Sequence, residues 1–274
     1  MMMRRRIVPG MVGIAVAGAV LTTVAAAQPS LSVASPDGRN VVTVTVRQGT
    51  LSYSLDRQGK PLLLPSRLGF DFRGAPPLGD SVRIVDSART KVDETWTQPW
   101  GEVARVRDQH NELRVTAEET TSRHRRFVVA FRAFDDGVAF RYELPEQPGL
   151  GDFEIMDERT EFTFAQNARA WWIPSNKPRL DRSEFLYAAS PLSTLDSIQT
   201  PVTLELGDGH TAVVIHEADL VDYPRMFLAG RGMENNSLRA ALAPMADGVK
   251  ARGRTPFETP WRTIQVASSV KELA

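Results

Sequence analysis

The alternation of apolar and polar residues is clearest from Phe127 to Leu144, a segment that reads FVVAFRAFDDGVAFRYEL. Two runs with a period of two lie on either side of Asp135-Asp136-Gly137, and this pattern predicts two antiparallel β-strands joined by a tight turn. Asp-Gly is a strong hairpin signal, and we expect Gly137 to supply a positive φ there. Both faces of the two runs are largely apolar, which indicates a central strand pair in a two-layer sandwich.

Further alternating segments predict that strands make up most of the remaining chain. Val41–Val46 and Leu51–Leu55 flank a Gln-Gly turn, and Pro201–Leu206 and Ala212–His216 flank a Gly-Asp-Gly turn. The region from Pro61 to Asp80 carries prolines and glycines among short apolar pieces, which favours brief strands. Because turn signals recur every ~8–12 residues, we expect one all-β domain of roughly fourteen to eighteen strands.

The segment Asp93 to Glu112 combines Trp96, Trp100 and His110 with amide and acidic residues. One interpretation is a carbohydrate platform, in which an aromatic face covers the C–H side of a sugar ring while polar groups bind its hydroxyls. The other interpretation is structural: the tryptophans close the end of the sandwich, and His110 is an ordinary hydrogen-bonded histidine. The residues alone favour the structural interpretation.

Two other segments are predicted to be loops. Glu118 to Arg126 holds the basic cluster of the exported part and is predicted to be a solvated turn. Ser175 to Gln199 is rich in Ser, Pro, Asp and Arg, and it follows Trp171-Trp172-Ile173-Pro174, a sequence that ends a strand abruptly. Long loops in compact domains commonly carry function, so this second segment is a candidate site region.

The N-terminal residues 1–27 differ from the rest of the chain. Arg4, Arg5 and Arg6 precede an apolar run over residues 7–24 and an Ala-Ala-Ala site. This order is typical of a secretory signal peptide, so we expect residues 1–27 to be removed and residues 28–274 to form one exported domain, in a bacterial periplasm or outside the cell. A membrane anchor is the alternative, because the run could just span a bilayer, but small residues dilute it and we expect no stable anchor.

The composition and the motifs exclude several classes of partner and of catalytic chemistry. Lys and Arg number 33, as do Asp and Glu, for a formal net charge of +0, so nothing indicates a nucleic-acid or anionic-membrane partner. The absence of cysteine excludes thiolate zinc sites and thiol nucleophiles. Neither a Gly-rich nucleotide loop nor a G-x-S-x-G elbow occurs. Glycoside hydrolysis needs two positioned carboxylates, and no local rule selects a pair among the 33 acids.

Several motifs occur in the order and approximate spacing of glycoside hydrolase family 97, which the chain resembles from Ser35 to Val266. They are W-T-Q-P-W-G-E at 96–102, H-N-E-L at 110–113, F-D-D-G-V-A-F-R-Y at 134–142, W-I-P at 172–174, H-E-A at 216–218, V-D-Y at 221–223 and T-P-W-R at 259–262. The resemblance implies an all-β fold, a large antiparallel β-super-sandwich of the galactose-mutarotase-like kind. In the family this domain precedes a (β/α)₈ catalytic barrel and a small C-terminal β-domain, and this chain resembles only the first of the three.

The resemblance also implies which residues belong to a site. The family's catalytic carboxylates lie on the barrel, so no catalytic residue is assigned to this chain. In the calcium-dependent members the sandwich contributes one glutamate to the metal site, and the matching position here is Glu184. The next loop, with Ser197, Gln199 and Thr200, is implied to lie beside the sugar. Calcium binding is therefore expected only together with the barrel.

Three functional hypotheses remain. In the first, the chain is the N-terminal, carbohydrate-associated domain of an exported exo-α-glycosidase, α-glucosidase- or α-galactosidase-like, in a truncated or split gene product that is inactive alone. Its partners would be an oligo- or polysaccharide and a (β/α)₈ catalytic domain in cis or from a neighbouring gene. The second hypothesis is a stand-alone periplasmic glycan-binding module. The third is an aldose-epimerase-like activity with a His and a Glu as acid and base, although packing at a strand end explains His216-Glu217 equally well.

Overall fold

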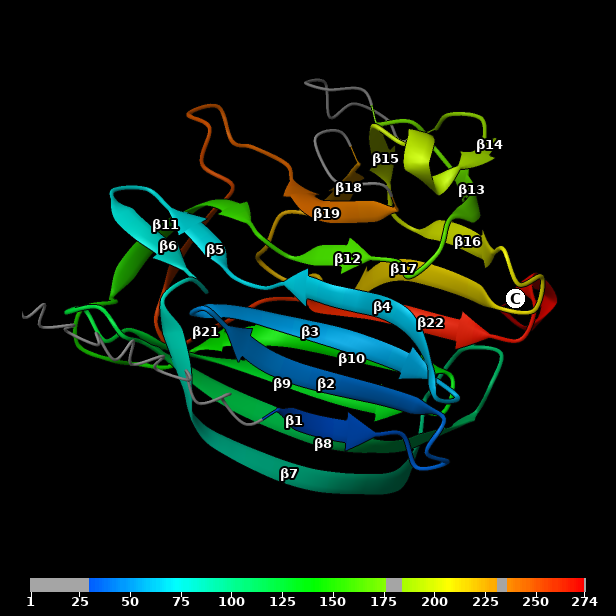
Figure 1. Cartoon of the computed structure of the whole chain (residues 1–274), viewed down its shortest axis with the longest axis horizontal. Helices are drawn as coiled ribbons and strands as arrows, with labels where there is room; N and C mark the ends of the chain where they lie inside the picture. Colours follow the sequence, from blue (N-terminus) through cyan, green and yellow to red (C-terminus); the bar gives the residue numbers. More distant parts are fainter. Residues whose placement is uncertain (1–29, 176–183, 231–235, 274) are drawn as a thin grey trace, which may run out of the picture.

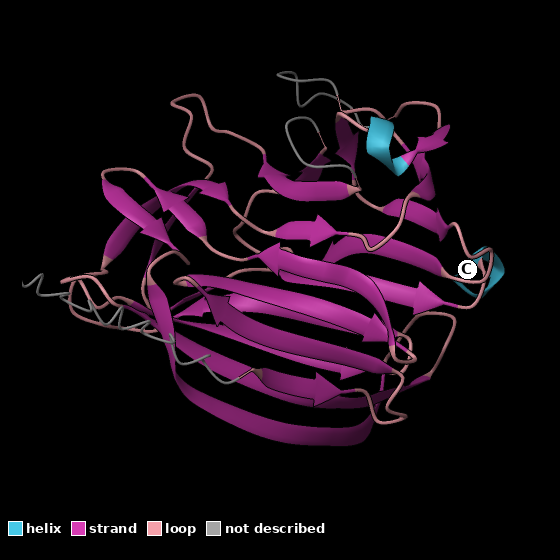
Figure 2. Cartoon of the chain, viewed as in Figure 1, coloured by secondary structure: helices cyan, strands magenta, loops and turns pink. Residues whose placement is uncertain are grey.

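The computed structural model describes residues 30–175, 184–230 and 236–273, and the predicted signal peptide lies outside these residues. Within them the chain consists of β-strands and two short 3-10 helices (Figures 1 and 2). No helix in these three ranges is long and apolar enough to cross a membrane. An all-β super-sandwich, the fold class that the resemblance implied, is confirmed.

The described ranges contain more strands than the fourteen to eighteen expected, because several have only two to four residues and show no readable alternation. The strands are β1 Leu31–Ala34, β2 Asn40–Arg47, β3 Thr50–Arg57, β4 Lys60–Arg67, β5 Phe70–Phe72, β6 Ala75–Leu78, β7 Val82–Thr97, β8 Arg105–Glu119, β9 Arg126–Phe134, β10 Gly137–Leu144, β11 Asp152–Glu158, β12 Glu161–Thr163, β13 Ala168–Trp172, β14 Ala188–Pro191, β15 Ser197–Gln199, β16 Val202–Leu206, β17 Ala212–Ala218, β18 Met226–Ala229, β19 Ser237–Leu242, β20 Ala251–Arg254, β21 Phe257–Glu258 and β22 Trp261–Ala267. The 3-10 helices are η1 Leu192–Thr194 and η2 Val270–Leu273.

One large antiparallel sheet organises the molecule, and three four-stranded sheets accompany it. Its ten strands run in the order β14-β13-β16-β17-β22-β10-β9-β8-β7, with β21 also paired to β10. The small sheets are β1-β2-β3-β4, β20-β11-β5-β6 and β12-β19-β18-β15. Figure 1 shows β1 to β4 lying in front of the large sheet, and the apolar side chains of both layers form one continuous core.

The predicted central hairpin is confirmed, since β9 and β10 lie in the middle of the large sheet, between β8 and β22. Phe134 pairs with Gly137 across the two-residue turn. The expected positive φ at Gly137 is wrong, because none of the turn residues adopts one. Glycine is needed for another reason: a Cβ at this position would collide with the Ile264 carbonyl and lie 2.9 Å from Gln265 Cα on β22.

Aromatic packing joins the hairpin to the front sheet. Tyr53 on β3 packs against both hairpin strands, with its ring centroid 5.8 Å from that of Phe131 and 4.9 Å from that of Phe140. All three side chains are buried, and the Tyr53 hydroxyl donates to the Glu161 carbonyl at 2.9 Å. A buried tyrosine needs such a partner, because an unpaired hydroxyl in the core would be costly.

The segment from Glu118 to Arg126 contains the predicted solvated turn at residues 120–124, but charged residues on either side of that turn are buried. Arg125 and Glu119 are each 1% exposed, and the guanidinium binds the carboxylate through two hydrogen bonds of 2.8 and 2.6 Å. Arg125 also donates to the Pro76 carbonyl of β6 at 2.8 Å. The charges compensate each other inside the protein, a possibility that net polarity along the sequence does not reveal.

The tryptophans of the family-like W-T-Q-P-W-G-E motif do not close the end of the sandwich. Trp96 is 50% exposed and Trp100 is 82% exposed. They lie near the tip of the long β7–β8 hairpin, where β8 pairs with β9 only from Asn111 onward, so the tip extends past the neighbouring strand. His110 is hydrogen-bonded through Nδ1, which lies 2.6 Å from an Asp108 carboxylate oxygen, whereas its buried Nε2 has no partner among the described residues.

The segment Ser175 to Gln199 is more regular than the predicted loop where the structure describes it. It contains β14, η1 and β15, and residues 176–183 lie outside the described ranges. β15 pairs with β18, and an isolated bridge joins Pro174 to Ile198. This bridge places the end of the W-I-P motif beside the residues that were expected to face sugar.

Candidate functional site

Among the predicted site residues, Gln199 is held by hydrogen bonds to two other segments of the chain. It ends β15, is 5% exposed, and donates its side-chain amide to the Pro174 carbonyl at 2.9 Å. Its backbone N–H binds the Ile173 carbonyl at 2.9 Å. Arg225, from the connection before β18, donates to the Gln199 side-chain oxygen at 2.7 Å. The amide is therefore held in one orientation by two segments that are distant in sequence.

Thr200 and Ser197 flank this amide. The Thr200 hydroxyl donates to the Met226 carbonyl at 2.8 Å. Ser197 Oγ is buried and has no hydrogen-bond partner among the described residues. Since buried hydroxyls are normally paired, Ser197 Oγ is a free polar group at this place. The structure therefore brings Ser197, Gln199 and Thr200 together along one short stretch that is fixed at both sides.

Glu184 is described as an exposed residue at the start of the second range. No group of three or more His, Asp or Glu side chains that could hold a metal ion occurs in the described ranges. Calcium takes about six to eight oxygen ligands, so these residues do not by themselves provide a complete calcium site. The structure thus shows the Glu184 carboxylate as exposed, outside any such group.

Four of the family-like motifs meet in a buried ionic network behind the site. Arg262 of β22 is 0% exposed, and its Nε and Nη2 donate to the two oxygens of Glu158 at 2.9 and 2.6 Å. Its Nη1 donates to Glu217 of β17 at 2.7 Å. The Tyr223 hydroxyl binds Glu158 at 3.1 Å, and Tyr142 joins through Thr160. Arg262, Glu217, Tyr223 and Tyr142 belong to the motifs T-P-W-R, H-E-A, V-D-Y and F-D-D-G-V-A-F-R-Y respectively, whereas Glu158 and Thr160 lie outside them.

The buried network is connected to Thr200 through the backbone of Met226. Both oxygens of Glu217 accept the Met226 N–H, at 3.0 and 3.1 Å, and the Met226 carbonyl accepts the Thr200 hydroxyl. The chain of contacts from Arg262 through Glu217 and Met226 to Thr200 is thus continuous. Because Glu217 is engaged in this way, packing explains this carboxylate, and it is not free to act as the acid or base of the epimerase-like hypothesis. The neighbouring His216 Nδ1 is buried and has no hydrogen-bond partner among the described residues.

Burial raises the pKa of Glu158. The charge of Arg262 and the hydrogen bonds from Arg262, Thr160 and Tyr223 outweigh burial, so the pKa stays below the usual 4.5. Burial and the nearby negative charge of Glu158 raise the pKa of Tyr223. Glu158 is therefore charged and Tyr223 neutral at neutral pH, which is the pairing that the geometry requires.

Acid is expected to weaken the folded state through Glu158. Because its folded pKa is lowered, its contribution is fully present above the unfolded pKa near 4.5 and is lost as the pH falls through the folded value. Urea unfolding between pH 7 and pH 3 measures this loss. In Glu158→Gln the part of the decrease below about pH 5 that belongs to this group should be absent. Tyr223→Phe, a milder change, should leave most of it, and equal slopes in Glu158→Gln and wild type would contradict the assignment.

Sequence reasoning missed Arg225 and Glu158 as residues that support the site. Arg225 has no distinguishing pattern around it, and Glu158 ends a strand that reads like any alternating segment. The one usable signal is that the H-E-A, V-D-Y and T-P-W-R motifs each carry a polar residue next to apolar ones. A polar residue kept at a core position indicates a buried pair, but the sequence does not identify the partner.

The fold defines the class of protein, an all-β super-sandwich domain. A profile of the family described as Glycosyl-hydrolase 97 N-terminal matches residues 33–274. The chain belongs to this family, and the resemblance predicted from its motifs is confirmed.

Two solved structures from Pseudoalteromonas sp. strain K8 are glycoside hydrolase family 97 enzymes in complex with panose and with acarbose. Each is 39% identical to this chain, with a TM-score of 0.83 over 87% of this chain and 36% of the enzyme. A retaining alpha-galactosidase from Bacteroides thetaiotaomicron is 26% identical over 90% of this chain and 40% of its own length. This chain thus spans about two fifths or less of the length of these relatives.

Proposed function

We propose that this chain is the N-terminal domain of an exported exo-α-glycosidase, in which it completes the substrate and calcium interface of a separate (β/α)₈ catalytic domain. The observation that carries the proposal is the fixed stretch at Ser197, Gln199 and Thr200, tied through Met226 to the buried network. A preorganised amide and hydroxyl are suited to hold a sugar hydroxyl without losing further conformational freedom.

The comparisons support the same role. The relatives named above are glycosidases more than twice as long as this chain, and two of them are complexes with panose and with acarbose. The two carboxylates that hydrolysis requires would come from the catalytic domain. This chain would then be inactive alone, because hydrolysis needs both carboxylates in place.

The activity of the chain is tested directly. The purified chain should not release p-nitrophenol from aryl α-glucosides or α-galactosides, whereas joining it to the remaining part of a family relative should restore turnover. Gln199→Ala in the joined protein should lower kcat/KM by about tenfold, the effect of losing one preorganised hydrogen bond of about 1.4 kcal/mol. Turnover by the chain alone that survives repurification, and that a misfolded control lacks, would defeat the proposal.

The calcium role of Glu184 is tested in the same joined protein. Glu184→Gln keeps the shape and removes the charge, so calcium activation should require at least about tenfold more calcium. Glu146→Gln is the matched control, since Glu146 is also an exposed loop glutamate. If both variants respond to calcium like the parent protein, another residue supplies the ligand.

The second candidate function, a stand-alone glycan-binding module, is favoured by one observation. Trp96 and Trp100 are exposed near the tip of the β7–β8 hairpin, where an aromatic face is accessible to a sugar ring. Binding of polysaccharide by the chain alone, abolished in Trp100→Ala, would support this candidate. Absence of a catalytic barrel gene beside this one would support it as well.

A further inference from the structure

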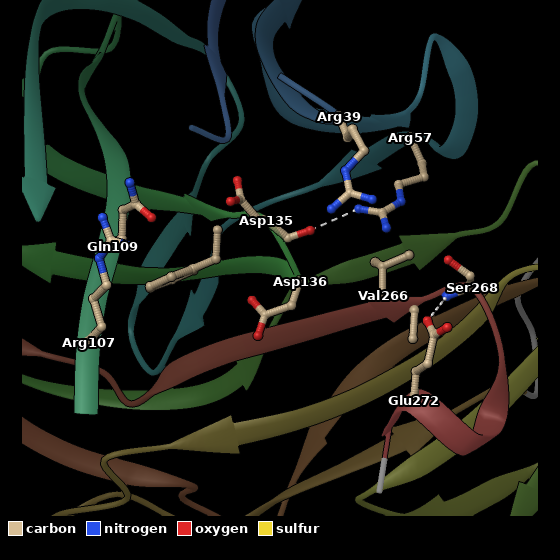
Figure 3. Close-up of a pocket in the computed structure, with 11 residues that line it drawn as sticks. Arg39, Arg57, Arg107, Gln109, Asp135, Asp136, Val266, Ser268 and Glu272 are labelled. Carbon is tan, nitrogen blue, oxygen red and sulfur yellow. Dashed lines mark hydrogen bonds between the residues drawn. The ribbon is translucent and has the colours of Figure 1, made fainter. Parts of the chain in front are cut away.

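A polar cavity of about 390 Å³ lies at the end of the large sheet next to the β9–β10 turn (Figure 3). Its volume falls within the range of about 300–1,000 Å³ that is typical of small-molecule sites. β22 ends here and is followed by η2, close to the described C-terminus, whereas β15 with Gln199 lies in another part of the molecule (Figure 1). The cavity is therefore separate from the candidate site.

The turn beside the cavity is held rigidly. Asp135 accepts the Asp37 N–H at 2.9 Å, and Asn40 donates its amide to the Phe134 and Asp135 carbonyls at 2.8 and 3.2 Å. Arg57 donates to the same Asp135 carbonyl at 3.0 Å. On its other side, the Asp136 carbonyl accepts the β22 backbone at 2.7 Å. Such a frame keeps the cavity walls in place without a ligand.

Several planar polar groups facing the cavity have hydrogen-bonding capacity left. In the described ranges, the side chains of Asp136 and Gln109 make no hydrogen bond or ion pair, and Arg57 uses only Nη1, on two neutral acceptors. Burial and the neighbouring charge of Arg39 lower the pKa of Arg57, and the charges of nearby aspartates only partly offset them. The hydrogen bonds of the guanidinium itself go to neutral oxygens, those of the Asn40 side chain and the Asp135 carbonyl. Figure 3 shows Gln109 and Arg107 on one side, Arg39 and Arg57 on another, and Asp136 between them.

The charge and polarity of the cavity lining indicate which chemical class of ligand fits it. Three arginines and three acids line the cavity, so the lining attracts neither anions nor cations as a whole. Phe134 and Val266 add an apolar part to the wall. Free carboxylate, amide and guanidinium groups around an apolar wall match a neutral ring that carries several hydroxyls and a C–H face.

We infer that this cavity is a second saccharide-binding site, one that takes a neutral pyranose residue of an oligosaccharide. The inference rests on the proposed carbohydrate role of the domain and adds a contact apart from Gln199. Asp136 and Gln109 accept and donate hydrogen bonds to adjacent ring hydroxyls, while Arg57 donates to a third oxygen. Two separate contacts on one domain retain a long glucan better than one, because the second contact forms at high effective concentration.

Titration calorimetry of the full chain with maltotriose, a neutral trisaccharide, tests the inference. Asp136→Asn and Gln109→Leu keep the side-chain size and should each weaken binding by about tenfold, the effect of losing one charge-assisted or one preorganised hydrogen bond. The exposed control Glu146→Gln should bind like wild type, and Gln199→Ala, measured in parallel, reports any binding at the candidate site. Thermal unfolding midpoints equal to that of wild type exclude misfolding of the cavity variants.

The other outcomes separate this inference from the proposed function. If only Gln199→Ala loses maltotriose, the sugar binds at the candidate site; the cavity inference is overturned and the proposed function stands. If wild type binds no maltotriose at tens of millimolar, the cavity inference fails, while the joined protein still decides the proposed function. Heat from sodium sulfate that is lost in Gln109→Leu and kept or increased in Asp136→Asn, without heat from maltotriose, would make the cavity an anion site and would also overturn the inference.

Discussion

Replacing Arg262 with methionine is expected to lower the free energy of unfolding by about 3–5 kcal/mol, a large part of the stability of a typical domain. The substitution keeps most of the side-chain volume and removes the cation that two buried carboxylates share. Glu158 and Glu217 then remain inside the protein without compensation, and an unpaired buried charge is costly. Urea unfolding followed by tryptophan fluorescence measures the loss.

A second set of variants separates this cause from simple loss of packing. Arg262→Met combined with Glu158→Gln and Glu217→Gln removes all three charges, and it should recover a substantial part of the lost stability, because apolar or neutral replacements of buried ion networks are often tolerated. Arg254→Met removes one partner of the exposed pair with Asp152 and should leave the midpoint unchanged within error. A triple variant no more stable than Arg262→Met would show that geometry, and not charge, is what the network provides.

The fold was largely predictable because alternation records which side of a strand is buried. The hairpin at Phe127 to Leu144 and the hairpin at 201–216 lie where the pattern placed them. In each hairpin the apolar side chains contact the core directly. The period of two in the sequence therefore shows which side chains face the core. Short strands such as β21, with two residues, contain too little sequence for any period and were not predicted.

Pairing between distant charges was not predictable. Arg262 and Glu158 are 104 positions apart, and Gln199 and Arg225 come from different strands and connections. The alternation of apolar and polar residues carries no information about contacts between distant residues or about the pairing of charges. Arg125 was therefore predicted to be solvated, although it is buried and paired with a carboxylate. Likewise, Trp96 and Trp100 look like core residues in the sequence, and only the overhang of the β7–β8 hairpin exposes them.

The sequence analysis explained Gly137 by a positive φ in the turn, whereas the structure explains it by the close approach of β22. Replacing Gly137 tests the second explanation. Gly137→Ala would place a Cβ against the Ile264 carbonyl, so β10 and β22 must separate at the centre of the large sheet. We expect a loss of about 1–3 kcal/mol or more in the free energy of unfolding, since a backbone contact cannot be relieved by a side-chain rotation. Hydrogen exchange should show faster exchange of the amides that join these strands.

The matched control is Gly151→Ala, in the connection before β11. An added Cβ there meets no atom within 4 Å, and φ lies outside the left-handed region, so the substitution should leave stability unchanged or raise it slightly by restricting the unfolded chain. If turn conformation were the reason for glycine at 137, Asn would replace it well, because Asn tolerates positive φ. Close approach predicts instead that Gly137→Asn is at least as destabilising as Gly137→Ala, since any Cβ meets the same carbonyl.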